Sequence, residues 1–264
     1  MRPLTRRIVL LAAAGLALGL AGDDAGADGT PVIAAAADLQ FALAEVAAAF
    51  MAETGQEVRL TFGSSGNLYR QIREGAPFEL YLSADEQFVL DLAKDGLAVD
   101  EGALYAVGRL ALFVPHGSPL EADGTLAGLK AALAEGHITR FAIANPEHAP
   151  YGRRAEEVLR HQGLWEDLAP KLVLGENVSQ AAHFAAAGDA QGGIIAYSLA
   201  LAPDIAALGE SALIPEAWHA PLRQRMALLR GHGRIAAMFF DFMQTKPART
   251  IMRRYGFVLP GEAM

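Results

Sequence analysis

Residues 32–73 read VIAAAADLQFALAEVAAAFMAETGQEVRLTFGSSGNLYRQIR, and this stretch alternates short apolar segments with amphipathic ones. Residues 32–36 form a small apolar strand, and a helix follows because apolar residues then recur at helical spacing until Gly55. The residues at this spacing are Leu39, Leu43, Val46 and Phe50. Residues 58–62 alternate as a second strand, and residues 67–74 form a second, short helix. This β-α-β-α order predicts an α/β fold with a mainly parallel sheet covered by helices on both faces.

The rest of the chain continues this alternation in two sets, separated by a long β-prone stretch at residues 104–114. Further strands are predicted at residues 78–82, 138–144, 172–174, 193–197 and 223–229. Further helices are predicted at residues 87–94, 126–133, 152–161, 178–187, 232–244 and 247–255. No long linker separates the sets, so two lobes joined by extended crossings near 110 and 220 are expected. We expect residues 28–112 and 222–264 to form a discontinuous first lobe and residues 113–221 to form the second. A ligand cleft between such lobes follows, because open parallel sheets bind ligands at the carboxyl ends of their strands.

The N-terminus predicts a secretory signal peptide over residues 1–27. A basic start with Arg2, Arg6 and Arg7 precedes an uncharged, mostly apolar run at residues 8–22, and a small-residue A-x-A site follows at residues 25–27. The run is shorter than the ~20 residues of a membrane span, although a short membrane anchor is the alternative. A lipid anchor is excluded because no cysteine follows. The protein is therefore expected to be exported to a bacterial periplasm.

Composition removes several classes of function. The chain has 264 residues, no cysteine, and 22 basic against 30 acidic side chains, for a formal net charge of −8. A nucleic-acid partner is disfavoured because phosphate contacts need clustered Lys and Arg. Without cysteine there is no disulfide framework, cysteine nucleophile or thiolate zinc site. The seven histidines are scattered and show no metal-binding spacing, so neither a metal site nor a cofactor is expected.

Four predicted strand-to-helix turns carry small or polar residues. They lie at residues 37–38, 63–66, 149–152 and 176–179. Each helix start presents unpaired backbone N–H groups and the positive end of the helix dipole. Serine, aspartate and asparagine are also ordinary helix caps, so one turn alone is weak evidence. Two turns in each lobe, however, could together form an anion site made of neutral donors.

Motifs along nearly the whole chain after the leader connect these turns to a known family. They are residues 35–39 (AAADL), 62–68 (FGSSGNL), 71–78 (QIREGAPF), 82–85 (LSAD), 145–152 (NPEHAPYG) and 254–257 (RYGF). This pattern resembles the periplasmic molybdate-binding proteins of ABC transporters, a branch of the type II periplasmic binding proteins. The resemblance implies a two-lobed α/β fold with mixed, mostly parallel sheets. It also implies a monomer that captures molybdate or tungstate in the interlobe cleft and delivers it to an inner-membrane permease.

The resemblance also implies which residues bind the oxyanion. The serine ligand of the second turn falls on Ser65, with Ser64 beside it, and a valine N–H donor falls on Val178. Tyr151 matches the branch in which a Pro-Tyr-Gly tyrosine contributes its N–H and phenol. In the other branch the tyrosine comes from a late strand, where Tyr197 lies one residue out of register, which reverses the side-chain face. Molybdenum would be bound only as its oxyanion, through these same residues.

Asp38 departs from the family pattern, because one branch has a ligand serine at this position. A carboxylate aimed at the ligand would repel each unit of its charge by ~4 kcal/mol at 4 Å and an effective dielectric of 20. Asp38 is expected to cap its own helix and leave its backbone N–H for the ligand. The alternative is that Asp38 accepts a proton from a ligand such as hydrogen phosphate, which would change the specificity.

The expected function is therefore solute binding and not catalysis. Two alternatives stay open: a binding protein for sulfate, phosphate or a phosphonate, and a secreted serine hydrolase. The hydrolase is disfavoured because the stretch at residues 63–66 is not the G-x-S-x-G nucleophile elbow and no histidine follows in an obvious triad order.

Overall fold

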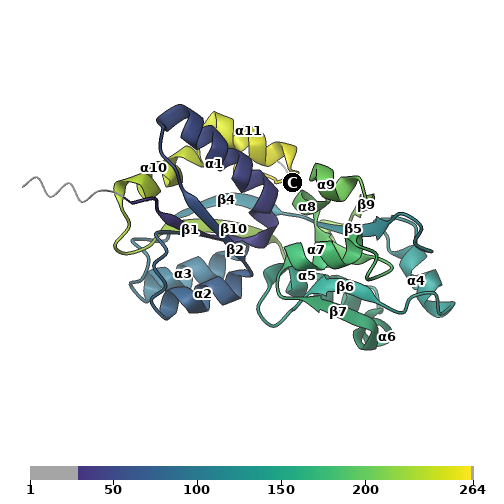
Figure 1. Ribbon diagram of the computed structural model, residues 1–264. Helices are drawn as coiled ribbons and strands as arrows, with labels where there is room; N and C mark the ends of the chain where they lie inside the picture. The colour runs from purple at the N-terminus through teal and green to yellow at the C-terminus, as the bar shows by residue number, and fades with distance from the viewer. Residues whose placement is uncertain (1–28, 263–264) are drawn as a thin grey trace, which may run out of the picture.

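The computed structural model describes residues 29–262, which form two lobes, each built on a five-stranded sheet covered by helices (Figure 1). The predicted signal peptide, residues 1–27, lies outside the described residues. The two-lobed α/β architecture with mixed sheets predicted from the sequence is confirmed. Within the described part of the chain, no helix is both long enough and apolar enough to cross a membrane.

The sheet of the first lobe has the strand order β2-β1-β3-β10-β4. Its strands are β1 (Val32–Ala36), β2 (Arg59–Gly63), β3 (Leu80–Ser83), β4 (Ala103–Gly108) and β10 (Leu222–Leu228). Its helices are η1 (Ala37–Leu39), α1 (Gln40–Thr54), α2 (Ser65–Arg73), α3 (Glu86–Lys94), α10 (Arg234–Phe242) and α11 (Lys246–Arg254). In Figure 1, α1 and α11 cover one face of this sheet, and α2 and α3 cover the other.

Alternation along β1 explains the two layers of helices in the first lobe. Ile33 and Ala35 belong to the core under α1, whereas Ala34 packs with Leu68 of α2 on the opposite face. All three β1 residues are fully buried, as expected for a central strand between two helical layers. The α1 helix ends where predicted, because Gly55 adopts the left-handed conformation with φ of 70° that suits a helix C-cap.

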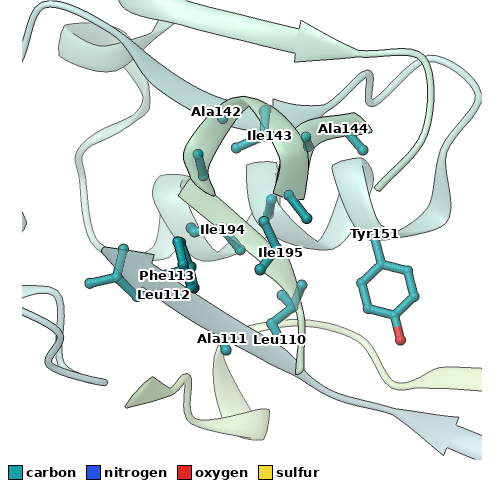
Figure 2. Packing of buried hydrophobic residues seen from close by; sticks show 14 of the residues in the cluster. Leu110, Ala111, Leu112, Phe113, Ala142, Ile143, Ala144, Tyr151, Ile194 and Ile195 are labelled. Carbon is teal, nitrogen blue, oxygen red and sulfur yellow. The ribbon is translucent and has the colours of Figure 1, made fainter. Parts of the chain in front are cut away.

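The sheet of the second lobe has the order β7-β6-β8-β5-β9. Its strands are β5 (Leu110–Pro115), β6 (Phe141–Ala144), β7 (Leu172–Gly175), β8 (Gly193–Ala196) and β9 (Gly209–Leu213). Its helical segments are α4 (Ala127–Ala134), α5 (Pro150–His161), α6 (Trp165–Leu168), η2 (Ala169–Lys171), α7 (Val178–Ala186), α8 (Tyr197–Ala200), α9 (Pro203–Ala206) and η3 (Glu216–Trp218). Figure 2 shows its hydrophobic core, in which Phe113, Ile143 and Ile194 come from three neighbouring strands.

Half of the strand pairings within residues 29–262 are antiparallel, so the sheets are less parallel than predicted. The antiparallel pairings all involve β10 in the first lobe or β5 in the second. These two strands enter their sheets from the other lobe, since β5 follows β4 and β10 follows β9. A strand that arrives from the cleft runs away from it and is therefore antiparallel to strands whose carboxyl ends point into the cleft.

The first crossing between lobes lies at Arg109, between β4 and β5. The expected boundary after residue 112 falls inside β5, which pairs with β8 and β9 along its length and so belongs wholly to the second sheet. The β-prone stretch at residues 104–114 is continuous, so its sequence does not indicate where the chain passes from the first sheet to the second. The structure also contains β9 and three short helices, α6, α8 and α9, that the sequence pattern did not predict.

Candidate functional site

The starts of η1, α2, α5 and α7 meet where the carboxyl ends of the two sheets face each other. They line a small cavity between the lobes. The first lobe contributes Asp38, Ser64 and Ser65, and the second lobe contributes Tyr151 and Val178. No Lys, Arg or His lines the cavity in the described part of the chain, so its attraction for an anion comes from hydroxyl groups, N–H groups and helix dipoles.

Ser64 and Ser65 are both buried at the start of α2 but have different partners. The Ser64 hydroxyl caps the helix by accepting the Asn67 N–H at 3.3 Å, and it lies 2.9 Å from Nδ1 of His148. The Ser65 hydroxyl accepts the Ala84 N–H at 3.0 Å. Because Ser65 Oγ accepts this bond, its O–H hydrogen remains available to donate to a ligand in the cavity.

The second lobe offers backbone donors from two helix starts. Pro150 is the first residue of α5, so Tyr151 lies in the first turn, where an N–H group has no acceptor within the helix. Val178 begins α7 in the same way, while the side chain of Asn177 caps that helix by accepting the Gln180 N–H at 3.0 Å. The N–H groups of Tyr151 and Val178 are therefore free of helical hydrogen bonds at the edge of the cavity.

Asp38 does not cap its helix, contrary to the expectation from the sequence. It is the middle residue of η1, and neither η1 nor α1 has a side-chain cap. Its Oδ2 atom instead accepts hydrogen bonds from the Tyr151 hydroxyl at 3.0 Å and from Nε2 of Gln224 at 2.6 Å. One of these donors comes from α5 and the other from β10. The 3-10 turn between β1 and α1 makes this possible, because it moves the start of α1 beyond Asp38.

Burial changes the protonation of this cluster. Asp38 is 1% exposed, and desolvation raises the pKa of its carboxyl from 3.8 to about 6, although the hydrogen bonds from Gln224 and Tyr151 oppose the rise. Burial, together with the charge of Asp38, also raises the pKa of Tyr151 and of Tyr105 well above 10. Both phenols are therefore neutral donors at physiological pH, and Asp38 is the group in this cluster that titrates near neutrality.

Contacts at the rim hold the lobes together around the cavity. The Gly66 N–H donates to the carbonyl oxygen of His148 at 3.0 Å, and the Asn67 side chain donates to Glu176 at 3.0 Å. A side chain on Gly66 would not fit, because a Cβ atom there would lie 2.5 Å from the His148 carbonyl oxygen. These contacts join α2 to the loops before α5 and α7, so the lobes are closed.

The structure brings five of the six predicted binding residues to one cavity: Asp38, Ser64, Ser65, Tyr151 and Val178. It places Tyr197 elsewhere. Tyr197 begins α8, and its ring packs so closely against Gly256 that a Cβ atom there would lie 2.6 Å from the ring. Figure 2 shows the Tyr151 ring extending beyond the hydrophobic core of the second lobe, with its hydroxyl pointing away from that core.

Two residues that contact Asp38 were not singled out from the sequence. Gln224 donates to its carboxyl, and the Ser198 hydroxyl donates to its backbone oxygen at 2.8 Å. The alternation of β10 carries a signal for Gln224, because it lies between the buried residues Leu222 and Met226 on the inward face of the strand. Ser198 follows β8 in a short helix and has no comparable signal. Within residues 29–262, no three acidic or histidine side chains are grouped to hold a metal ion.

Comparisons with known proteins identify relatives of this chain. A model of the bacterial extracellular solute-binding protein family matches residues 31–258. The chain is 38% identical to the molybdate-binding protein ModA of Rhodobacter capsulatus, over 88% of this chain and 89% of that protein. It is 32% identical to ModA of Escherichia coli K12, over 95% and 97% of the two chains.

A solved structure of a molybdate-binding protein also matches the fold of this chain. The periplasmic molybdate-binding protein of Azotobacter vinelandii superimposes with a TM-score of 0.80 at 29% identity, covering 87% of this chain and 99% of that one. A family model that spans nearly all of the described chain, together with relatives aligned over most of their length, establishes the membership. The chain belongs to the bacterial extracellular solute-binding protein family, in the group of the molybdate-binding proteins.

Proposed function

We propose that the protein is an extracytoplasmic binding protein that captures molybdate or tungstate between its lobes and delivers it to the permease of an ABC transporter. The observation that carries this proposal is the closed cavity lined from both lobes by helix starts and serine hydroxyls, with no cationic side chain among the described residues that line it. Neutral donors of this kind suit a compact, fully deprotonated oxyanion. The relatives named as molybdate-binding proteins support the choice of ligand.

Export and delivery follow from the same proposal. The basic start, short apolar run and A-x-A site of residues 1–27 are those of a cleaved signal peptide, and the Azotobacter relative is periplasmic by name. Lobes that close over the ligand present a surface that differs from the open form, and a permease can recognise that difference.

A second candidate ligand is a hydrogen-bearing oxyanion such as hydrogen phosphate. The observation in its favour is Asp38, a buried carboxyl on the cavity that could accept the proton of such a ligand. A hydrolase is disfavoured even though Ser64, His148 and Glu176 form a chain of contacts. Glu176 is largely exposed and lies 3.6 Å from His148, and the Ser64 hydroxyl already caps α2. We propose that these three residues act in lobe closure.

Isothermal titration calorimetry with molybdate, tungstate, sulfate and phosphate tests the proposal. We expect tight binding of molybdate and tungstate at pH 7.5, and binding of sulfate and phosphate at least about 100-fold weaker, a difference of about 2.7 kcal/mol. Tight binding of phosphate or sulfate with no response to molybdate would assign the protein to another oxyanion.

Replacing Ser65 by alanine is expected to weaken oxyanion binding by about 1–3 kcal/mol, because a hydrogen bond to a charged group is lost. The Ala84 N–H also loses its acceptor. Titration of Ser65→Ala and of an exposed control, Ser211→Ala on β9, measures the effect. An unchanged affinity in Ser65→Ala would remove this hydroxyl from the binding site.

A further inference from the structure

The two carboxyl oxygens of Asp38 have unequal surroundings. Oδ2 accepts two hydrogen bonds, from Tyr151 and from Gln224. Oδ1 is buried and has no hydrogen-bond partner among the described residues. A buried polar atom without a hydrogen-bond partner lowers the stability of the protein. Such atoms are therefore rare in native structures, and they often mark a functional site. Because Asp38 lines the cavity, Oδ1 is the oxygen that remains for a ligand.

The direction of the hydrogen bonds around Asp38 determines where a proton can sit. Tyr105 donates to Oε1 of Gln224 at 2.8 Å, so the NH₂ group of Gln224 must face Asp38. That NH₂ group also donates to the Tyr151 oxygen at 3.2 Å, which leaves the Tyr151 hydrogen to donate to Oδ2. Oδ2 thus already receives two hydrogens. A proton that binds to Asp38 must therefore bind to Oδ1, on the side that has no donor.

Within residues 29–262, the groups packed against Asp38 supply no positive charge. Tyr151 from α5 and Tyr105 from β4 are neutral phenols, while Gln224 from β10 and Ser198 from α8 do not ionise. Two further titratable groups lie at the rim: His148, which contacts Ser64, and the largely exposed Glu176, which contacts His148. An ionised Asp38 beside a doubly charged oxyanion would therefore face strong repulsion that no neighbouring cation offsets.

We propose that Asp38 takes up one proton on Oδ1 when a fully deprotonated oxyanion binds, and that this O–H donates a hydrogen bond to a ligand oxygen. The proton comes from solvent, and no covalent bond to the ligand is made or broken. The inference rests on the proposed function and adds the reason why an aspartate is tolerated there: the carboxyl acts as a neutral donor in the bound state. Burial already favours this state by raising the pKa of Asp38 to about 6 before any ligand arrives.

Proton counting tests the inference on the unmodified protein. Molybdate is titrated at pH 8 in buffers of different ionisation enthalpy, and Kd is measured from pH 6 to pH 9. We expect uptake of close to one proton per molybdate and a Kd that rises about tenfold per pH unit above the pKa of the free carboxyl. Hydrogen phosphate brings its own proton, so any phosphate binding is expected to show little uptake.

Asp38→Asn is the matched variant, because its amide cannot ionise but can place an N–H where the carboxyl places its O–H. We expect this variant to bind molybdate with no proton uptake and with a Kd that does not change with pH. Asp189→Asn, at an exposed position between α7 and β8, is the control and should behave like the unmodified protein.

The titrations of the unmodified protein and of Asp38→Asn distinguish the inference from the proposed function. Molybdate binding without proton uptake in the unmodified protein would overturn the inference and leave the proposed function intact. Uptake that persists in Asp38→Asn would assign the proton to another group, such as His148, and would also overturn it. Absence of binding for every oxyanion in both proteins would instead overturn the proposed function itself.

Discussion

Replacing Gly66 by alanine is expected to weaken molybdate binding about 100-fold, or about 2.7 kcal/mol, without destabilising the protein. The added Cβ atom would lie 2.5 Å from the backbone oxygen of His148, a distance that the closed lobes cannot accommodate. The Gly66 N–H would lose its 3.0 Å hydrogen bond to the same oxygen. Since the two residues belong to different lobes, the clash acts on lobe closure and not on the folding of either lobe.

The Gly66→Ala variant should be at least as stable as the unmodified protein, even though it binds molybdate more weakly. Gly66 is a helical residue of α2, and replacing a helical glycine by alanine stabilises the folded protein by about 0.5–1 kcal/mol. Urea unfolding of the ligand-free protein should therefore show equal or higher stability, while calorimetry shows the loss of affinity. Gly29→Ala is a matched control, because nothing lies within 4 Å of a Cβ atom there. A variant that binds within twofold of the unmodified protein would mean that the bound lobes do not bring Gly66 to His148.

Asp38→Asn is expected to make the ligand-free protein more stable at pH 7.5 by up to about 3 kcal/mol. The pKa of Asp38 is about 6 in the folded protein, against 3.8 ordinarily, so the folded state holds the proton more tightly than the unfolded state. Stability then falls as the pH rises from about 4 to about 6, and above that range the loss is complete. At 1.36 kcal/mol per pKa unit, the loss is about 3 kcal/mol. An asparagine avoids it because it never ionises.

The pH dependence distinguishes this effect from a change in packing. The difference in unfolding free energy between Asp38→Asn and the unmodified protein should be largest at pH 7.5 and much smaller near pH 4, where Asp38 is protonated in the folded state and about half protonated in the unfolded state. Urea titrations at both pH values measure it, with Asp189→Asn as the exposed control. An equal difference at both pH values would show that ionisation of Asp38 is not what the substitution removes.

The binding site is not optimised for stability. Gly66 makes α2 less stable than an alanine would, but it allows the two lobes to come into contact. Asp38 has a titratable carboxyl at a position where burial disfavours its charge. Functional sites commonly retain such unfavourable features. Here each feature has a separate measurable purpose, lobe closure for Gly66 and proton-linked ligand binding for Asp38.

The local elements of this protein could be read from sequence because they depend on periodicity and capping. The helical spacing that ends at Gly55 and the serine cap before α2 are properties of neighbouring residues, so they are visible without the fold. Two lobes with helix starts at one cleft followed from the order of strands and helices. The antiparallel placement of β5 and β10 did not, because it depends on which lobe each strand enters from.

The two-lobed architecture can be predicted from sequence because strand order and helix caps are local in origin. The same is true of the turns that carry Ser64, Ser65, Tyr151 and Val178. The role of Asp38, in contrast, depends on contacts between distant parts of the chain. Its partners Tyr151 and Gln224 lie 113 and 186 residues away along the chain. A capping carboxyl and a carboxyl held between two lobes have the same local sequence. They differ only in which distant donors the fold brings within hydrogen-bond distance, and that difference decides where the proton of Asp38 can bind.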